Sequence, residues 1–563
     1  MKNSEELRQQ LRSINRKSYP AKKGLKGLYH FGNYILSIDH VQGDPFASPS
    51  HVSIQISHRD AGFPVEYYKD TLTGTTLCDY LTRQFEKQVS QYSFRAKGSG
   101  KSGLLTVSHC GQEILSRTAC EITEKGITAR FFVGFPANGR TINATELEKI
   151  LFDFLPVCIQ KSFFYSSLNA KELQNYIELA EDQEFIRQTL PAKNLCAFIA
   201  DGSILPRESG ISSRPMKASV PFTSPDSLRI SINLPHKGKI TGMGIPKGIT
   251  LIVGGGYHGK STLLNALELG VYNHIPGDGR EYVITDATAV KLRSEDGRFI
   301  KDVDISMFIN DLPNKKDTRC FSTLDASGST SQAAGIVESM EAGSHLFLLD
   351  EDTSATNFMV RDAFMQQVIQ REKEPITPFL ERAEDLYKKA GISTILVAGS
   401  SGAFFHIADT IIQMDNYVPK DITASVKKLC SQYPLPAVSV TDFQLPHSHR
   451  IMSRPAESSK RLIHNSRGNH SDSGAAKPER LKTRISGTDG FSLGRQEIDL
   501  RYTEQLIDAE QTAALGLLLK YAVEHLADGR RTLPEIVQFL WKNLSLHGLS
   551  FFTENQKISC GYA

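Results

Sequence analysis

The sequence lacks any apolar run that approaches the roughly 18 residues needed to cross a membrane. Its eight cysteines form no C-x-x-C pair, so neither a zinc ribbon nor a redox motif is indicated. Residues 1–17 contain no apolar stretch of the kind that a secretory signal requires. We therefore expect a cytoplasmic protein without a membrane partner, whose cysteines are scattered thiols of a reducing compartment.

Strong charge of one sign is also missing. The formal net charge is +3 over 563 residues, so composition alone does not imply an anionic partner, and local clusters must carry that argument. The chain is 40% hydrophobic, which is enough for ordinary buried cores. Its length predicts about three or four domains.

The stretch RAKGSGKSGLL, residues 95–105, has the Gly-Lys-Ser of a phosphate-binding loop without the rest of that motif. The first glycine that the motif requires falls on Arg95. No buried strand precedes the stretch, and the residues that follow resemble a strand rather than a helix. We interpret it as a basic, flexible loop between a helix and a strand.

The stretch LIVGGGYHGKSTLLNAL, residues 251–267, satisfies the G-x-x-x-x-G-K-[ST] motif in full. The apolar run 249–253 predicts a buried strand before the loop, and Thr262 opens an amphipathic helix after it. Lys260 would neutralise the β- and γ-phosphates of ATP, and Ser261 would bind Mg²⁺. The predicted nucleotide-binding residues of the loop are Gly254, Gly255, Gly256, Tyr257, His258, Gly259, Lys260, Ser261 and Thr262.

A second buried strand is predicted in HLFLLDED, residues 345–352, and it ends in carboxylates. An acid in this position can reach Mg²⁺, and the next acid can orient a water molecule. We expect Asp350 to hold Mg²⁺ through water and Glu351 to act as the general base.

Residues 325–359, DASGSTSQAAGIVESMEAGSHLFLLDEDTSATNFM, resemble the run from signature loop to Walker B strand in ABC-class ATPases. The spacing from Ser327 to Asp350 is that of typical cassettes. The resemblance implies that Ser327, Gly328 and Ser329 form the signature loop and that Ser354 belongs to the D-loop. Taken alone, this motif is also compatible with a Ser/Gly turn before a helix.

Some positions depart from the pattern of the ABC class. Gly399, Ser400 and Ser401 stand where the switch histidine is expected, so the γ-phosphate sensor is either a serine hydroxyl or absent. This difference predicts slow turnover, with Ser400 and Ser401 as the candidate replacements. Asn310 is the stand-in for a missing Q-loop glutamine, and Phe222 is the candidate for stacking on adenine.

The chain is similar to one branch, the predicted ATPases of the ABC class, over about residues 25–515. The resemblance is carried by LIVGGGYHGKSTLL, ITDATAVKLRSEDGR, DISMFINDLP, STLDASGSTSQAAGIVE, DHVQGDPFASPS (39–50) and DGSILPRESGISSRP (201–215). It implies ATP and Mg²⁺ as ligands and nucleic acid, especially RNA, as a partner. After about residue 545 the sequence departs from the arginine-rich ending of that family.

We predict an α/β protein in which a P-loop ABC-type ATPase domain, a mostly parallel sheet with flanking helices, lies between two further domains. The predicted parts are an α/β N-terminal domain (1–170), a linking helix (171–190), the ATPase domain (191–425) and a small C-terminal domain (426–563). Within the last, 446–490 is rich in Ser, His, Pro and basic residues and is predicted to be flexible.

Three basic segments are candidates for nucleic-acid binding. One is the loop of Arg95, Lys97 and Lys101, the second is the excursion 446–490, and the third is residues 8–26, where Tyr19 lies among lysines and arginines and Tyr29 follows. Basic loops with nearby aromatic residues suit sequence-tolerant binding of single strands. A solvated, solubilising surface is the alternative interpretation.

Three hypotheses follow. The first is an ATP hydrolase that closes as a head-to-tail homodimer, with ATP between one P-loop and the partner's signature loop, and that couples this closure to RNA. The second is an ATP-gated protein scaffold with weak or no hydrolysis. The third, the nucleotide-binding domain of a transporter, is disfavoured because no membrane span is predicted.

Overall fold

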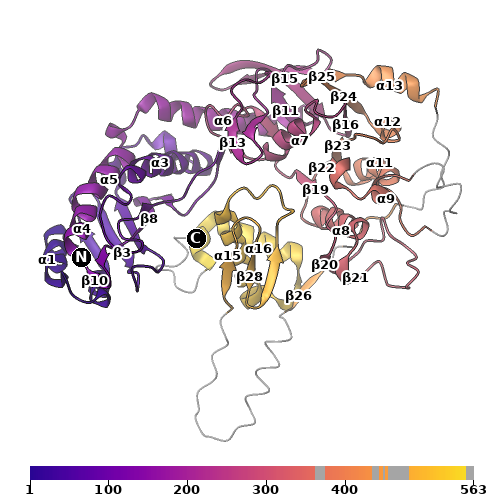
Figure 1. Cartoon of the computed structure of the whole chain (residues 1–563). Helices are drawn as coiled ribbons and strands as arrows, with labels where there is room; N and C mark the ends of the chain where they lie inside the picture. The colour runs from indigo at the N-terminus through magenta and orange to yellow at the C-terminus, as the bar shows by residue number, and fades with distance from the viewer. Residues whose placement is uncertain (362–373, 434–442, 448–449, 454–480, 553–563) are drawn as a thin grey trace, which may run out of the picture. The chain divides into compact units, whose positions relative to one another are not determined.

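The computed structural model describes residues 1–361, 374–433, 443–447, 450–453 and 481–552 (Figure 1). These residues form two compact units. The first comprises residues 1–182 with 274–276 and the residues from 547 onward, and the second comprises 183–273 and 277–546. The boundary falls within a helix, α6 (Ala170–Ala192). None of the helices in these ranges is long and apolar enough to cross a membrane.

The first unit is built on a seven-stranded sheet with the order β1-β2-β3-β4-β8-β5, in which β7 also pairs with β8. Its strands are β1 (Lys2–Asn3), β2 (Gly27–His30), β3 (Ile35–His40), β4 (Ser50–Ile56), β5 (Leu105–Thr106), β7 (Cys120–Thr123) and β8 (Gly126–Val133). The helices are α1 (Ser4–Ile14), α2 (His58–Ala61), α3 (Thr71–Tyr92), α4 (Ala144–Glu148) and α5 (Leu155–Phe163).

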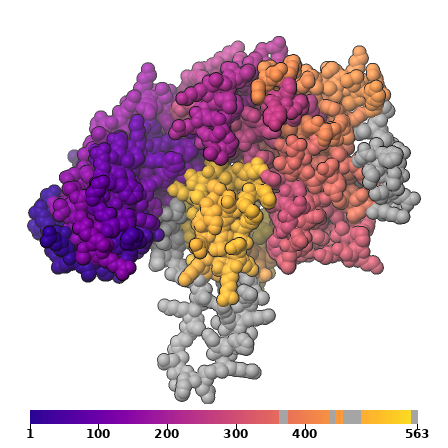
Figure 2. All heavy atoms as spheres, in the orientation of Figure 1, coloured from indigo at the N-terminus to yellow at the C-terminus, as the bar shows by residue number. Residues whose placement is uncertain are grey.

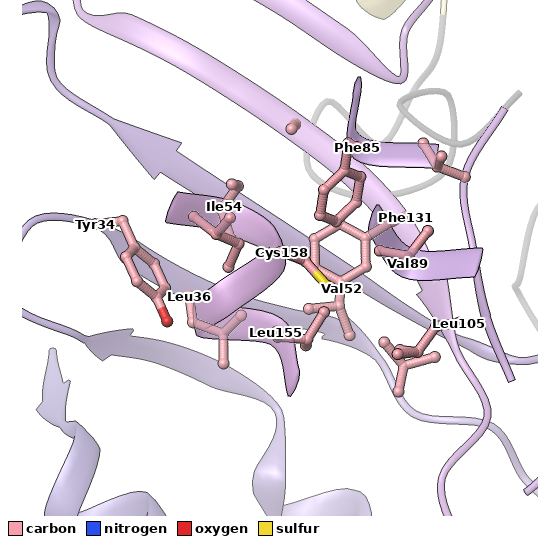
Figure 3. Packing of buried hydrophobic residues seen from close by; sticks show 14 of the residues in the cluster. Tyr34, Leu36, Val52, Ile54, Phe85, Val89, Leu105, Phe131, Leu155 and Cys158 are labelled. Carbon is pink, nitrogen blue, oxygen red and sulfur yellow. The ribbon is translucent and has the colours of Figure 1, made fainter. Parts of the chain in front are cut away.

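Alternation of side chains along these strands places one apolar face of the sheet against helices. Val52 and Phe131 are paired across β4 and β8, and both are buried. They lie in one cluster with Phe85 of α3 and Leu155 of α5 (Figure 3). Since successive residues of a strand point to opposite faces, this pattern needs apolar residues at every second position.

The second unit contains a six-stranded sheet with the order β19-β22-β23-β16-β24-β25. Its strands are β16 (Ile249–Val253), β19 (Val290–Leu292), β22 (Leu346–Asp350), β23 (Ser393–Val397), β24 (Thr410–Asp415) and β25 (Val418–Asp421), and all except β25 are parallel to their neighbours. Helices α7 (Lys260–Leu269), α8 (Gly328–Glu341), α9 (Thr356–Met359), α11 (Phe379–Ala390) and α12 (Phe404–Ile407) accompany it.

Both faces of this sheet are covered. Leu346 and Leu348 pack in the cluster that includes leucines of α7, whereas Phe347 and Leu349 pack with residues of α8 and α11. A strand buried on both faces reads as a continuous apolar run, which is why β16 and β22 could be predicted. The predicted strand before the P-loop is confirmed as β16, and the predicted helix after the loop is confirmed as α7. The predicted strand that ends at Asp350 is confirmed as β22.

A four-stranded antiparallel sheet, of order β14-β15-β11-β18, belongs to the same unit. Its strands are β11 (Leu195–Ala200), β14 (Arg229–Leu234), β15 (Gly238–Pro246) and β18 (Val283–Thr285). Phe222 is 2% exposed in a cluster with residues of β11 and β15. The suggestion that Phe222 stacks on adenine is therefore wrong, because its ring is used in the core.

The described C-terminal residues of this unit include small sheets and the helices α15 and α16. Their bounds are β26 (Ile451–Ser453), β27 (Thr483–Ile485), β28 (Gly490–Leu493), β29 (Gln496–Asp499), β30 (Asp528–Thr532), α15 (Ala509–Tyr521) and α16 (Leu533–His547). Figure 2 shows residues 481–546 in yellow beside other residues of the same unit.

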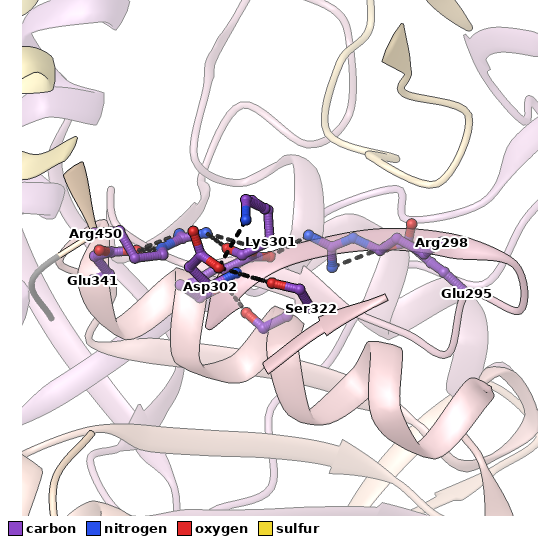
Figure 4. Close-up of polar contacts among 10 residues, drawn as sticks. Glu295, Arg298, Lys301, Asp302, Ser322, Glu341 and Arg450 are labelled. Atoms are coloured by element: carbon purple, nitrogen blue, oxygen red, sulfur yellow. Dashed lines mark hydrogen bonds and ion pairs between the residues drawn. The ribbon is translucent and has the colours of Figure 1, made fainter. Parts of the chain in front are cut away.

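Two sets of polar contacts connect the C-terminal residues to α8 and to β19. Arg450 donates from Nε to Glu341 at 2.9 Å and from Nη1 to Glu338 at 3.2 Å, both on α8 (Figure 4). Glu504 accepts hydrogen bonds from Lys291 and Arg293, beside β19. The C-terminal residues are thus tied to α8 and to β19, the edge strand of the six-stranded sheet.

Candidate nucleotide site

The P-loop, residues 254–259, joins β16 to α7 through backbone conformations that require glycine. Gly254 has φ +145° and Gly259 has φ +97°. A Cβ on Gly254 would lie 2.4 Å from the carbonyl oxygen of Met414, and one on Gly259 would lie 2.9 Å from the ring of Tyr417. Both glycines are therefore fixed by conformation and by the neighbouring strand end.

Lys260 is the first residue of α7, and its ammonium group bends back over the loop. Its Nζ donates to the carbonyl oxygens of Gly254 at 2.6 Å and Gly255 at 3.0 Å. The positive charge therefore lies at a helix N-terminus beside exposed loop residues, where backbone N–H groups and the helix dipole also favour an anion. Ser261 is exposed at the same helix start.

Tyr257 and His258 of the P-loop differ in their surroundings. Tyr257 has φ +64° and is 98% exposed. The Nδ1 atom of His258 accepts a hydrogen bond from the backbone N–H of Asn416 at 2.9 Å, and its carbonyl oxygen accepts one from Tyr417 at 3.2 Å. The Nδ1 atom of His258 thus braces the turn between β24 and β25.

The carboxylates of Asp350 and Glu351 lie at the same edge of the sheet as the P-loop. Val397 is the register partner of Asp350 on one side and of Ile252 on the other, so the ends of β22, β23 and β16 are aligned. Asp350 is buried, and burial raises the pKa of its carboxyl group. In open α/β sheets, ligands bind at this carboxyl edge.

Glu351 is held by the loop that follows β23. Its Oε2 accepts hydrogen bonds from the backbone N–H groups of Gly399 at 2.7 Å and Ser400 at 3.0 Å, and its Oε1 accepts one from the Ser400 hydroxyl at 2.7 Å. Burial alone would raise the pKa of this carboxyl group, but these donors, with the N–H of Ser401, lower it. Glu351 is therefore kept ionised by the residues that stand where a histidine was expected.

These groups fit ATP with Mg²⁺. The loop offers backbone donors and an ammonium group for phosphates, and the Ser261 hydroxyl and Asp350 carboxylate are the hard oxygen ligands that Mg²⁺ prefers. Within the described ranges, no group of three or more His, Cys, Asp or Glu side chains is arranged to hold a metal by itself. A Mg²⁺ ion here would need phosphate and water oxygens as its remaining ligands.

The predicted signature loop begins α8. Ser327 is the N-cap residue and is exposed, with its Oγ 3.0 Å from the Thr330 hydroxyl. A Cβ on Gly328 would lie 2.3 Å from the Ser294 hydroxyl, so a larger residue here would displace that side chain. Ser329 is buried and donates to Oδ1 of Asn357 at 2.8 Å. Of the two serines, Ser327 presents its side chain outward.

Gln332 is a residue of this site that the sequence analysis missed. It is fully buried, and its Nε2 donates to the Ser354 hydroxyl at 2.9 Å while its Oε1 accepts from the N–H of Ala355 at 2.9 Å. Ser354 in turn donates to the carbonyl oxygen of Asp350 at 2.8 Å. Hydrogen bonds through Ser354 thereby connect α8 to the end of β22. The one feature of the sequence that could have indicated this role is a single glutamine among the small residues at the start of a predicted helix.

The loop of Arg95, Lys97 and Lys101 lies in the first unit, between α3 and β5. These three residues are exposed, whereas Ser102 is buried and its hydroxyl donates to the carbonyl oxygen of Ser99 at 2.5 Å. The residues that follow form strand β5, and a phosphate loop would need a helix there. This Gly-Lys-Ser is thus a loop between a helix and a strand, as the sequence predicts, but the expectation that the loop is flexible is wrong, because Gly100 and Gly103 pack against backbone atoms.

The other basic segments are less open than expected. Tyr19, Lys22 and Tyr29 are each at most 2% exposed, so the expectation that these aromatic rings serve nucleic acid is wrong. Arg450, from the excursion 446–490, is committed to Glu338 and Glu341. Much of that excursion, including Arg454, Lys460, Arg461, Arg467, Lys477 and Arg480, lies outside the described residues.

Comparisons with known families agree with this geometry. A model for the P-loop domain of ABC ATPases matches residues 169–448, and one for the N-terminal domain of ATPases of the ABC class matches residues 4–166. The MRB1590 C-terminal domain model matches residues 482–563. The fold and site define a P-loop ATPase, and the chain belongs to the ATPases of the ABC class.

One curated relative is the uncharacterized protein MJ1628 of Methanocaldococcus jannaschii, 31% identical over 266 residues. The match covers 45% of this chain and 58% of that protein, so the chain spans less than two thirds of the relative's length.

Among the solved structures that the chain resembles, two come from ABC transporters. The ADP conformation of the ABC transporter cassette MJ1267 is 13% identical with a TM-score of 0.23, covering 34% of this chain and 88% of the cassette. The cbiO1 subunit of the Clostridium perfringens ABC transporter complex cbiONQ is 12% identical with a TM-score of 0.23, covering 40% and 87%.

Proposed function

We propose that this protein binds and hydrolyses ATP with Mg²⁺ and couples the reaction to binding of single-stranded nucleic acid, with RNA favoured. The observation that carries the hydrolysis is the alignment of the P-loop, Asp350 and Glu351 at one edge of the sheet. Lys260 and the loop N–H groups would hold the phosphates, and Ser261 and Asp350 would hold Mg²⁺. When bound, Mg²⁺ neutralises charge that develops on the phosphate oxygens.

In this proposal Glu351 accepts a proton from the attacking water, and Ser400 positions it. The donors from Gly399 and Ser400 aim the carboxylate and keep it ionised, but they also lower its basicity. A base with a lowered pKa takes up a proton less readily, so turnover should be slow. Ser400 thus takes the place of the switch histidine as a positioning residue.

A composite site between two copies is supported by the signature helix. Ser327 is exposed at the start of α8, a helix of 14 residues whose first N–H groups have no partner within the helix. Such an end favours a phosphate. In our proposal the partner subunit's ATP approaches Ser327, so that two ATP molecules close a homodimer.

Nucleic-acid binding is supported by the exposed basic loop 95–101 and by the family resemblance. Binding at this loop should tighten or weaken with the nucleotide state, and linkage requires that the nucleic acid change ATP affinity by the same factor. The alternative is an ATP-gated protein scaffold. The tight hold on Glu351 favours that alternative, since a carboxylate bound by three donors could remain inactive.

The test combines Glu351→Gln with a fluorescent oligouridylate. This variant should retain ATP, form a dimer on sizing chromatography, and bind the oligonucleotide with an affinity that differs between the ATP-bound and nucleotide-free forms. Lys260→Ala should lose the ATP response, and Lys101→Ala should leave ATP binding intact. If the affinity for the oligonucleotide were the same with and without ATP in every variant, ATP and nucleic acid would not be coupled, and the result would favour the protein scaffold.

A further inference from the structure

Three loops of the first unit meet at one end of its sheet. They are the β3–β4 connection (41–49), the basic loop (94–103), and the turn between β9 (Ala137–Asn138) and β10 (Thr141–Ile142). Lys101 donates its backbone N–H to Pro45 at 2.8 Å, and Ser99 donates to Ala137 at 2.8 Å. The three loops therefore form one surface, which we call the loop platform.

The loop platform is built tightly. A Cβ on Gly100 would lie 2.6 Å from the carbonyl oxygen of Pro45, one on Gly103 would lie 2.1 Å from that of Ala96, and one on Gly134 would lie 1.8 Å from that of Lys101. These contacts leave no room for larger residues. The backbone of the loop platform is thus fixed by close packing, although Phe46, Lys97 and Lys101 are exposed on it.

Phe46 is exposed on the loop platform. The residue is 65% exposed, although its backbone is held by Asp44, whose Oδ1 accepts the Phe46 N–H at 3.0 Å. A Cβ on Gly100 would lie 2.9 Å from Cδ1 of Phe46, so the ring rests beside the glycine of the basic loop. An aromatic ring placed in this way leaves a large apolar surface open to a flat partner.

Three cationic residues belong to the same three loops as Phe46. Lys101 follows Gly100 directly, and Lys97 lies on the same loop, both exposed. Arg140 pairs with Asp44 at 3.3 Å, yet its side chain is 83% exposed, so part of its guanidinium group faces solvent. The Glu146 carboxylate nearby accepts the backbone N–H of Lys97 and pairs with Lys149. The loop platform therefore carries an exposed aromatic ring and three exposed cationic side chains on adjoining loops.

We propose that the loop platform is a binding site for single-stranded nucleic acid, in which one base stacks on Phe46 while Lys101 and Arg140 contact phosphates. This inference rests on the proposed function and names the residues that recognise the nucleic acid. A protein partner would need matched pockets, whereas a base needs only an open ring with cations at the spacing of the backbone. The ring makes recognition tolerant of sequence.

The experiment measures the anisotropy of a labelled oligouridylate of about 12 nucleotides, a length within the site size of such modules. Phe46→Ala in the full chain should weaken binding about 5- to 150-fold, the range for loss of one stacked base. Phe46→Tyr, which keeps the ring, should bind like wild type. Phe299→Ala is the matched control, because Phe299 is a similarly exposed phenylalanine of the second unit.

Salt dependence separates stacking from charge. Lys101→Gln and Arg140→Gln should each reduce the slope of log affinity against log salt by about 0.7, and Phe46→Ala should leave that slope unchanged. An oligomer with abasic sugars should bind wild type and Phe46→Ala equally. If Phe46→Ala weakened binding of the abasic oligomer as much as binding of the oligouridylate, Phe46 would not stack on a base and the proposal would be overturned.

The outcomes also separate this site from the proposed function. If Phe46→Ala and Lys101→Gln bind the oligomer like wild type, the loop platform is not the site, while the coupling of ATP to RNA stands. If the wild-type protein binds no oligomer with or without ATP, both proposals fail together. Preferential competition by a folded acidic protein over the oligomer would also reject the loop platform as a nucleic-acid site.

Discussion

The Ser400 hydroxyl donates a hydrogen bond of 2.7 Å to Oε1 of Glu351, the carboxylate that follows the buried Walker B strand. Hydrogen bonds to the charged form of an acid lower its pKa. The same contact therefore positions the proposed base and limits its strength.

Ser400→Ala should lower kcat about tenfold with little change in ATP affinity, because one hydrogen bond to a charged group is lost. Loss of this donor raises the pKa of Glu351, so the fall of kcat on acidification should begin at a higher pH than in wild type. Ser400→Thr, which keeps a hydroxyl, should restore both properties. A lower kcat with an unmoved pH profile would count against a positioning role.

Ser327 is the residue to test for a site shared between two chains. It is exposed, so Ser327→Arg should fold normally while its bulk blocks the approach of the partner's ATP. Mixing this variant with Lys260→Ala places both defects in one site of the heterodimer and leaves the other site whole. ATPase activity should recover in part on mixing. No recovery, with stable heterodimers present, would indicate a site complete within one chain.

Glu504 holds the C-terminal residues on the ATPase part through Lys291 and Arg293. Lys291 also pairs with the buried Glu268 of α7 at 3.1 Å. Glu504→Gln should reduce the free energy of unfolding by about 1–3 kcal/mol, because partly buried charges lose a partner. Arg501→Gln breaks the exposed pair with Asp499 and should cost less than about 1 kcal/mol. Equal urea midpoints for both variants would refute this anchor.

Lys22 predicts a pH dependence in the first unit. It is 1% exposed beside Tyr19, and burial lowers its pKa to about 6 against the opposing effect of Asp44. Between pH 6 and the ordinary lysine pKa the unfolded chain binds one more proton. Stability should therefore rise with pH by about 1.4 kcal/mol per unit.

Lys22→Met removes this titration. Relative to that variant, wild type should lose stability as the pH falls from 9 to 7 and stop losing it below pH 6. Hydrogen exchange of the β8 amides in urea reports the unfolding of this unit. Parallel pH profiles for the two proteins would mean that Lys22 stays charged in the folded state.

The sequence predicted those parts of the second unit that depend on local patterns. Strand β16 and the glycines of the P-loop were readable because a strand buried on both faces is uniformly apolar and a phosphate loop has fixed glycine positions. Ser327, at the start of α8, could be predicted from the number of residues between it and Asp350.

Contacts between distant segments could not be read in the same way. Nothing local to Gln332 shows that it binds Ser354, and nothing near Ser400 shows that it binds Glu351. Tyr19 and Tyr29 stand in a basic segment but are buried, because tertiary packing decides which face of that segment is solvated. The prediction that Phe222 stacks on adenine was wrong for the same reason, because tertiary packing buries its ring.

The most direct test of the central claim is the rate of ATP hydrolysis by Glu351→Gln, measured beside its ATP affinity. The amide cannot accept a proton, so hydrolysis should fall about 10²- to 10⁴-fold while ATP remains bound. A Glu351→Gln protein that hydrolyses ATP at the wild-type rate would contradict the account, since Glu351 would then not be the base.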